Sequence, residues 1–232
     1  MTVRVGTSGY NYPEWRGHFY PPDLPVKQMF AYYAVRFPTV EINATFYRMP
    51  TPKTVSGWAE AAPPGFVFVL KAPQRITHFS RLRDVDDPLR FFCDTARLLG
   101  PRLGPLLFQL PPNFKKDIDR LATVLVQIPP DLRSAWEFRH ESWFADDVYE
   151  RLRARNAALC IADTEDGTTP AVATADFGYL RLRAVDYSDA DLARWVEAIR
   201  TVGAGWRDTF VFFKHEESGS GPELAARFAA LL

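Results

Sequence analysis

Eight short apolar runs, separated by helical or turn-forming segments, constrain the fold of this chain more than any other feature. The runs cover residues 3–8, 38–43, 66–71, 105–110, 133–138, 158–163, 178–183 and 209–214. Apolar residues at helical spacing mark 26–37, 53–61, 88–99, 115–127, 146–155, 189–202 and 222–231. Strands that alternate with helices pair in parallel through right-handed crossovers, so eight such units predict a closed (β/α)8, or TIM, barrel.

The segment at 164–177 interrupts this alternation. It is too short and irregular for a full crossover helix, so we expect the sixth helix to be reduced or missing. The rival arrangement is an open, doubly wound sheet, but Gly6 and Gly9 lack the third glycine and the immediate helix of a dinucleotide-binding turn. The length of 232 residues suits one domain, and no linker or repeat divides the chain. Residues 1–232 are therefore predicted to form a single barrel domain.

Charge and composition exclude several classes of protein. Lys and Arg number 28, as do Asp and Glu, so the surface as a whole does not suit a long polyanion. Cys93 and Cys160 lie inside apolar segments without metal-binding or redox spacing, which predicts two buried free thiols. The first residues read as a strand rather than a signal peptide, and no apolar run approaches the length of a membrane helix. We therefore expect no membrane span and a cytoplasmic location.

Polar or charged side chains stand at or just beyond the end of most apolar runs. Buried parallel strands are normally apolar throughout, and an unpaired charge among them is costly. Ionisable groups at the same end of many strands therefore predict a shared site at the carboxyl mouth of the barrel. These residues are Glu41, Asn43, Lys71, Gln109, Glu137, Arg139, His140, Asp163, Arg181, Arg183 and Lys214, with Tyr47 in the loop after the second run.

The alternation of side chains along a strand groups these residues by face. Glu41 and Asn43 share a face opposite Val40 and Ile42. The same count groups Glu137 with Arg139, Arg181 with Arg183, and Gln109 with Leu107. If the polar faces point inward, the mouth holds five cations (Lys71, Arg139, Arg181, Arg183, Lys214) against three carboxylates (Glu41, Glu137, Asp163). That excess favours an anionic ligand, and Arg suits a bidentate grip on phosphate or carboxylate.

Three of these residues are predicted to be catalytic, with Glu41 and Glu137 as proton-transfer groups and Lys71 as a base or electrostatic stabiliser. We expect Lys71 to form a salt bridge with Glu41, whereas a depressed pKa would instead make it a base or an imine-forming amine. The predicted substrate-binding residues are Asn43, Tyr47, Gln109, Arg139, His140, Asp163, Arg181, Arg183 and Lys214. A purely structural web of salt bridges that plugs the barrel end is the alternative.

No metal ligand is predicted among the site residues, and no cofactor is assigned. The alternative is a metal held by His78 and His140 together with Glu41, Glu137 or Asp163. No closely spaced histidine pair occurs, and the lysines and arginines nearby oppose a cation.

Several motifs resemble the YecE-like family, the "domain of unknown function 72", or DUF72. They are Gly-Thr-Ser-Gly-Tyr at 6–10 with Trp15 and Phe-Tyr-Pro at 19–21, Val-Glu-Ile-Asn-Ala-Thr-Phe-Tyr at 40–47, Lys71, Ile-Thr-His at 76–78, Leu-Phe-Gln-Leu-Pro-Pro at 107–112 and Glu-Phe-Arg-His-Glu-Ser-Trp at 137–143. The resemblance implies a TIM-barrel fold and does not by itself imply an activity. It departs at Arg183, where the family usually has histidine in a Tyr-x-Arg-x-His-Gly segment, and at Lys214 and His215, where the family is usually rich in asparagine.

These observations favour an enzyme that acts at the barrel mouth on a small anionic, phosphorylated or carboxylated, polyhydroxy substrate. The reaction class (hydrolysis, isomerisation or lyase chemistry) stays open, and no oligomeric state is predicted. One alternative is a protein that binds or processes nucleic acid by stacking bases on aromatics beside arginines, although the balanced charge opposes a long polymer. Another is a non-catalytic metabolite-binding protein.

Overall fold

A closed parallel barrel forms the centre of the molecule. A computed structural model describes residues 1–214 and 219–232. Its barrel strands are β1 (Thr2–Ser8), β2 (Thr39–Ile42), β3 (Val67–Lys71), β4 (Leu103–Gln109), β5 (Ser134–Glu137), β6 (Ala158–Thr164), β8 (Phe177–Leu182) and β9 (Asp208–Phe213). Each pairs in parallel with its neighbours, and the pairings of β1 with β9 and of β5 with β6 close the ring. The predicted TIM barrel is confirmed.

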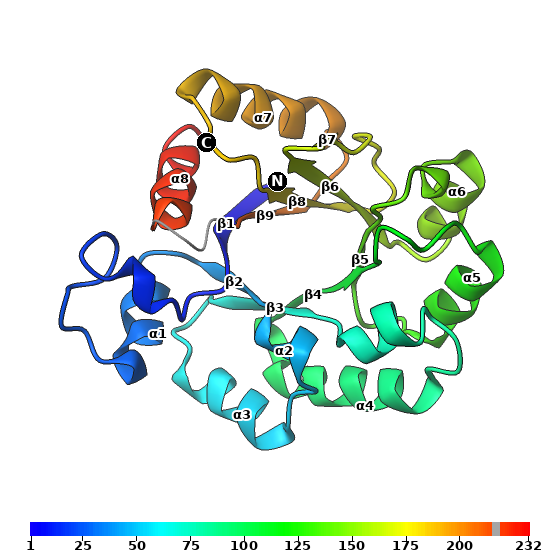
Figure 1. Ribbon diagram of the computed structural model, residues 1–232, viewed down its shortest axis with the longest axis horizontal. Coiled ribbons are helices and arrows are strands. Elements are labelled where there is room, and N and C mark those ends of the chain that lie inside the picture. Colours follow the sequence, from blue (N-terminus) through cyan, green and yellow to red (C-terminus); the bar gives the residue numbers. More distant parts are fainter. Residues whose placement is uncertain (215–218) are drawn as a thin grey trace.

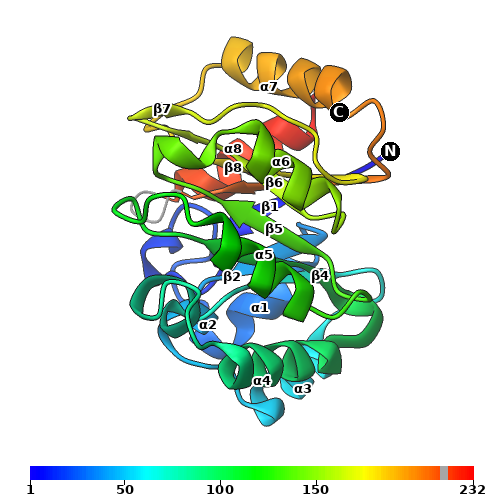
Figure 2. The same cartoon turned by 90° about the vertical axis from the view of Figure 1, so that its right-hand side faces the viewer.

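Helices surround the barrel and connect successive strands, as Figure 1 shows. They are α1 (Val26–Ala34), α2 (Ala44–Tyr47), α3 (Pro52–Ala61), α4 (Asp86–Ala96), α5 (Ile118–Gln127), α6 (Asp146–Arg153), α7 (Asp189–Val202) and α8 (Ser220–Ala229). Short helical turns occupy Pro13–Trp15, Arg75–Phe79, Arg97–Arg102 and Glu141–Trp143. In Figure 2, turned by 90°, β7 and α2 lie at one end of the barrel and the N-terminus at the other, so the carboxyl mouth faces the viewer in Figure 1.

The connection between β6 and β8 holds no helix in the residues that the structure describes, which confirms the expected loss of the sixth helix. The two-residue strand β7 (Gly167–Thr168) takes its place and pairs antiparallel with the end of β6. An extended segment then returns along the barrel wall, where Thr174 accepts a hydrogen bond from the backbone of Leu159 at 2.7 Å. A shortened chain therefore still closes the ring.

Two apolar cores follow from side-chain alternation. The core inside the barrel contains Val69, Leu107, Ala135 and Phe212, among others. The larger core lies between the strands and the helices and contains the opposite residues of the same strands, such as Trp136. The inward and outward faces predicted for the second, fourth, fifth and seventh barrel strands are confirmed.

Helix boundaries differ from the sequence-based expectation by a few residues, as side-chain caps explain in part. The Asp117 side chain accepts a hydrogen bond from the backbone of Arg120 at 3.1 Å, so α5 begins three residues later than predicted. Thr51 caps α3 by accepting from the backbone of Thr54. The predicted burial of both free thiols is confirmed, and the described residues contain no helix long and apolar enough to cross a membrane.

Candidate ligand site at the barrel mouth

The parallel register places several of the predicted residues side by side at the carboxyl ends of the strands. Ser8 of β1 lies in register with Glu41 of β2, and Gln109 of β4 lies in register with Glu137 of β5. All four are buried although they are polar. Because a buried polar group needs a hydrogen-bond partner, we expect these side chains to form one connected hydrogen-bond network.

Arg181 of β8 is the centre of this network. Its Nη2 donates to Oε1 of Glu41 at 2.9 Å, and its Nη1 donates to Oε2 of Glu137 at 2.5 Å. The three side chains are each 1% exposed or less. Burial alone would lower the pKa of Arg181, but Glu137 and Glu41 raise it well above its ordinary value. One buried cation therefore bridges two carboxylates from opposite parts of the sequence.

Glu41 is enclosed by hydrogen-bond donors. Besides Arg181, its carboxylate accepts from the Ser8 hydroxyl and, at 2.5 Å, from the Tyr179 hydroxyl. Asn43 extends the network, since its Nδ2 donates to the Ser8 oxygen at 2.7 Å. Burial and the nearby Glu41 raise the pKa of Tyr179 well above its ordinary value, so the tyrosine remains a donor. Glu41 thus has no face toward solvent.

Glu137 also lies close to two further arginines of the mouth. Its Oε1 accepts from Gln109 Nε2 at 2.7 Å and from Arg139 Nε at 3.1 Å, and Arg183 Nη1 lies 3.9 Å away. Burial favours the protonated form, but Arg181, Arg139 and Arg183 outweigh it and hold the pKa of Glu137 well below its usual range. The carboxylate is therefore ionised and serves as an anchor for arginines.

Lys71 does not form the salt bridge with Glu41 that the sequence led us to expect. That carboxylate is occupied by Arg181, which reaches it from β8 across the barrel. Lys71 Nζ instead donates to the neutral Gln109 Oε1 at 2.8 Å and lies 4.0 Å from the centre of the Phe46 ring. Burial, followed by the charge of Arg181, lowers the pKa of Lys71 to about 7. The second interpretation of this residue, a lysine with a depressed pKa, is the one that the geometry supports.

Two short helical segments place the groups around Lys71. The Thr45 hydroxyl lies within 2.9 Å of the Ile42 carbonyl and within 2.6 Å of the Lys71 carbonyl, so it fastens α2 to the ends of β2 and β3. This contact sets the Phe46 ring beside the amine. The π-helical turn Arg75–Phe79 places the His78 ring edge-on against the Phe46 ring, with 4.8 Å between the ring centroids. Burial and the charge of Lys71 lower the pKa of His78 to about 4, so the imidazole is neutral near pH 7.

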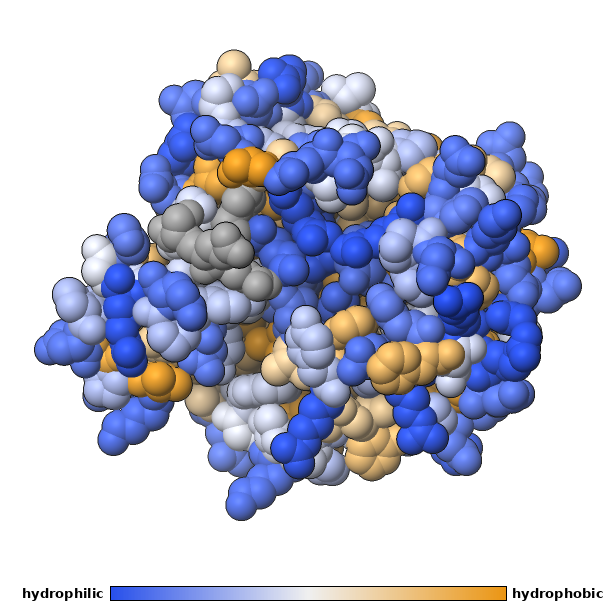
Figure 3. All heavy atoms as spheres, in the orientation of Figure 1, coloured by the Kyte–Doolittle hydropathy of each residue, from blue (hydrophilic) through white to orange (hydrophobic). Residues whose placement is uncertain are grey.

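Two hollows lie at the mouth beside the network. The arginine hollow, about 520 Å³, is lined by Glu137, Arg139 and Arg183 together with the loop that carries β7. The lysine hollow, about 450 Å³, is lined by Asn43, Lys71 and Lys214 together with aromatic residues of the first loop and of α2. Figure 3 shows hydrophilic residues gathered at the centre of this face, inside the ring of helices. Each hollow offers two cationic side chains to a ligand, but Glu141, Glu165 and Asp166 also line the arginine hollow.

Three predicted site residues lie apart from the network. Asp163 belongs to the outward face of β6, because Ala162 and Cys160 point inward, and it accepts from Thr168 and Tyr187 instead. The expected group of three carboxylates therefore contains only Glu41 and Glu137. His140 caps the turn Glu141–Trp143 through Nδ1. Tyr47 is 74% exposed and lies at the rim of the lysine hollow.

The residues considered for a metal site do not gather. Within residues 1–214 and 219–232, no three His, Cys, Asp or Glu side chains lie close enough together to hold a metal ion. His78 contacts Thr77 and Phe46, while His140 contacts its own helical turn. His215, part of the departure from the family pattern, lies outside the described residues.

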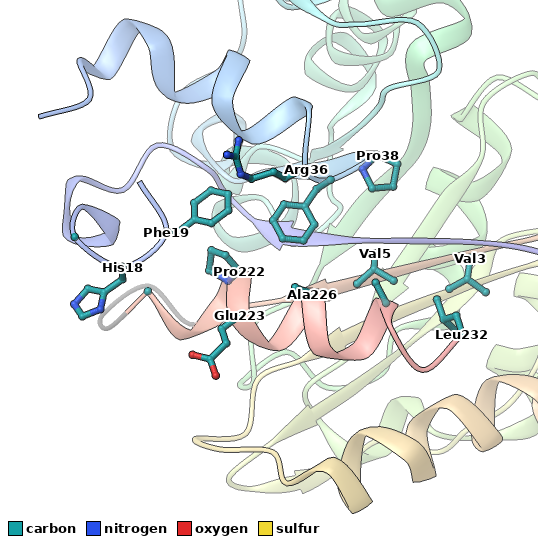
Figure 4. A pocket seen from close by; sticks show the side chains of 14 residues that line it. Val3, Val5, His18, Phe19, Arg36, Pro38, Pro222, Glu223, Ala226 and Leu232 are labelled. Atoms are coloured by element: carbon teal, nitrogen blue, oxygen red, sulfur yellow. The ribbon is translucent and has the colours of Figure 1, made fainter. Parts of the chain in front are cut away.

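A further hollow of about 950 Å³ lies outside the barrel, between the chain at the end of α1 and α8, and is shown in Figure 4. Apolar side chains such as Val3, Phe37 and Ala226 form most of its lining. His18, Arg36 and Glu223 lie at its edges, and none of the strand-end residues reaches it. Because the buried ionisable groups gather at the mouth, the mouth is the better candidate for chemistry.

Comparison with known proteins assigns the family. The family described as "Protein of unknown function DUF72" matches residues 4–232. The chain belongs to the DUF72 family. Its DUF72 relatives include the UPF0759 protein YecE of Escherichia coli K12, 35% identical over 154 residues, and the UPF0759 protein YunF of Bacillus subtilis 168, 25% identical over 272 residues. The first match covers 66% of this chain and 54% of the relative, and the second covers 99% and 94%.

Solved DUF72 structures share the fold. A DUF72 protein from Thermotoga maritima superimposes with a TM-score of 0.88 at 26% identity and covers 100% of this chain and 99% of its own. A DUF72 protein from Enterococcus faecalis gives 0.79 at 18% identity, covering 99% and 97%. The motifs that carried the family resemblance supply Glu41, Lys71, Gln109 and Glu137, which are the residues that meet at the mouth.

Four residues of the mouth were not predicted as site residues. Ser8 ends β1 on the inward face, and Tyr179 stands two residues before Arg181, so alternation along each strand was a sufficient signal for both. Phe46 and His78 lie in short helical turns, where no strand alternation applies. Their placement beside Lys71 required the structure.

Proposed function

We propose that this DUF72 chain is an enzyme that acts at the barrel mouth on a small anionic, phosphorylated or carboxylated, polyhydroxy substrate. The observation that carries the proposal is the convergence of Arg139 and Arg183 on one buried oxygen of Glu137. Their side chains are 33% and 22% exposed, so both remain in contact with the arginine hollow. Arg183 Nε, in addition, has no hydrogen-bond partner among the described residues. Two arginines held in this way offer donors to one bound anion.

The support for an anion comes from two local arginines and not from the net charge of the arginine hollow. Within the buried network, Glu41 and Glu137 offset two of the three charges of Arg181, Arg139 and Arg183, which leaves one positive charge. Glu141, Glu165 and Asp166 also line the arginine hollow, so its lining as a whole is not cationic. We propose that the anion lies directly against Arg139 and Arg183, where Coulomb attraction beside apolar walls is stronger than in open water.

Catalysis is proposed for this site because Lys71 is tuned for proton transfer. A group whose pKa lies near the working pH accepts and donates protons efficiently, and that of Lys71 is about 7. In this proposal Glu41 and Glu137 position Arg181 and the rim arginines, and Lys71 handles the proton. Asn43 Oδ1, buried without a partner among the described residues, and Gln109 orient substrate hydroxyls.

A ligand screen tests the anionic part of the proposal. Thermal stabilisation by sugar phosphates and sugar acids is compared with that by the parent neutral sugars. We expect the anions alone to stabilise the protein, and the double variant R139M/R183M to lose the effect. Arg194 is an exposed surface residue, so R194M is the matched control. Equal stabilisation by neutral sugars, or an undiminished effect in R139M/R183M, would contradict anion binding at these arginines.

Turnover separates the enzyme from its alternatives. We expect the stabilising anions to be converted by the wild type and not by K71M. Stabilisation without conversion would favour a non-catalytic metabolite-binding protein. Tight, salt-dependent binding of oligonucleotides would favour a nucleic-acid partner. A cytoplasmic location stays part of the proposal, and recovery of the expressed chain in a membrane or periplasmic fraction would contradict it.

A further inference from the structure

We propose that Lys71 forms an imine with the carbonyl carbon of its substrate, so that the substrate is an anionic aldehyde or ketone. The inference rests on the ligand site of the proposed function and narrows the chemistry that takes place there. It is carried by the contacts of one buried amine in the lysine hollow.

The surroundings of Lys71 Nζ suit a neutral amine. Its contacts are the Gln109 amide oxygen at 2.8 Å and the Phe46 ring at 4.0 Å. Among residues 1–214 and 219–232, no carboxylate lies within salt-bridge distance of Nζ, since Glu41 and Glu137 are taken by Arg181. An amine must be unprotonated to attack a carbonyl carbon, and desolvation without an ionic partner favours that form.

Every packed element contributes charges that bear on the protonation of Lys71. Arg181 of β8 and Arg139 after β5 disfavour a further cation, while Glu41 of β2 and Glu137 of β5 favour one. Lys214 after β9 lines the same hollow. His78 of the π-helical turn is neutral. Burial is the largest cause, and with these charges it lowers the pKa of Lys71 to about 7, in agreement with the contacts of the amine.

Gln109 fixes the direction of the amine. Its Nε2 donates to Oε1 of Glu137 at 2.7 Å, and an ionised carboxylate can only accept, so the amide oxygen must face Lys71. A neutral Lys71 amine can donate one hydrogen to that oxygen and keep its lone pair available. The lysine hollow is the space beside this amine. Gln109 therefore restrains the nucleophile without supplying a charge that would keep it protonated.

The reaction step balances within the protein and substrate. The Lys71 lone pair forms a C–N bond as the carbonyl π bond opens, and a proton passes from nitrogen to oxygen to give a carbinolamine. The nitrogen lone pair then forms the C=N bond as the C–O bond breaks, and the hydroxyl leaves as water with a proton taken from solvent, so that the imine nitrogen keeps its own hydrogen and is protonated. A protonated imine draws electrons from an adjacent C–H or C–C bond, so this step favours isomerase or lyase chemistry over hydrolysis. The anionic group of the same molecule would rest on Arg139 and Arg183, which the Lys71–Gln109–Glu137 chain of contacts joins to the amine.

Reductive trapping tests the proposal. The protein is incubated at pH 7 with dihydroxyacetone phosphate, glyceraldehyde 3-phosphate or pyruvate, reduced with sodium borohydride and mapped by mass spectrometry. We expect a secondary amine at Lys71, formed at least ~10-fold faster than at the exposed Lys53, because burial lowers the pKa of Lys71 and leaves its amine available for attack at pH 7. The variant K53R should trap as the wild type does, whereas K71R should lose the adduct. Since the modified residue is mapped in the unaltered chain, the result does not depend on the folding of K71R.

Labelling of Lys71 no faster than that of Lys53 with all three probes would overturn the imine. If in that case inorganic phosphate still stabilised the wild type and not R139M/R183M, the proposed anion site would be supported and only the imine would be rejected. Equal trapping of phosphorylated and neutral dihydroxyacetone would support the imine and contradict the anionic part of the proposed function. The two proposals therefore fail in distinguishable ways.

Discussion

Replacing Arg181 by methionine tests whether one buried cation holds the mouth together. The substitution removes the donors at 2.9 Å from Glu41 and at 2.5 Å from Glu137. Removing one partner of a buried ion pair typically costs about 3–5 kcal/mol, because the other charge is left without compensation. Here two carboxylates lose the same partner, so we expect a loss near the upper end of that range. Such a loss is a large share of the ~5–15 kcal/mol by which domains are stable.

The pH dependence of this loss identifies its cause. In the wild type the pKa of Glu137 is depressed, so its contribution to stability is present above the ordinary glutamate pKa and lost as the pH falls below it. Between pH 8 and pH 5 that contribution is constant. In R181M the pKa of Glu137 rises, so the folded variant binds a proton that the unfolded chain does not. For each pH unit by which the pH falls within this range, R181M regains about 1.4 kcal/mol of unfolding free energy. The difference in unfolding free energy between R181M and the wild type therefore narrows as the pH falls.

Urea unfolding at pH 8 and pH 5 measures both effects. The exposed Arg194, which pairs with Asp191 on its own helix, gives the control R194M, and we expect little change there. The triple variant R181M/E41Q/E137Q should recover part of the loss, because it removes the unpaired charges. A wild-type stability for R181M at pH 8, or a difference that does not change with pH, would refute the reasoning.

Three further predictions concern stability. The wild-type unfolding free energy should rise by up to ~1.4 kcal/mol per pH unit between pH 7 and 9.5, because Lys71 binds a proton in the unfolded chain but not in the folded one. The variant K71M should lack this rise. Parallel curves of unfolding free energy against pH for the two proteins would contradict this. Gly6→Ala should lower the free energy of unfolding by about 1–3 kcal/mol, because the new Cβ would lie 2.2 Å from the Thr39 carbonyl oxygen. Gly57→Ala, which has open space around it in α3, should raise that free energy by ~1 kcal/mol. Urea unfolding that gives the reverse order would contradict the packing. Tyr179→Phe should cost about 1–3 kcal/mol by leaving one Glu41 oxygen without a donor, and an unchanged unfolding midpoint would contradict that role.

The sequence predicts the barrel because alternation is a local signal. Each apolar run and each helical segment is recognisable within a dozen residues, and eight repeats leave few topologies. The inward placement of Glu41, Gln109, Glu137 and Arg181 follows in the same way from counting along each strand. The shortened link at 164–177 was also visible as a stretch too irregular for a helix.

The pairing of charges within the mouth was not predictable from the sequence. Glu41 lies next to β3 in the sheet, so Lys71 was the natural partner, yet the long side chain of Arg181 crosses the barrel to reach it. Contacts across a barrel depend on its diameter and on side-chain length, which no local pattern contains. The prediction that Asp163 points into the mouth was wrong for a different reason. Strand β6 is apolar on both faces, so its sequence gives no alternation from which to assign the inward face.

A crystal structure of the protein with a phosphorylated sugar bound tests the central claim most directly. We predict the anionic group against Arg139 and Arg183 beside Glu137, with the rest of the ligand extending toward Lys71. Binding of the ligand elsewhere, for example in the cleft between α1 and α8, with an empty mouth at saturating concentration, would contradict it.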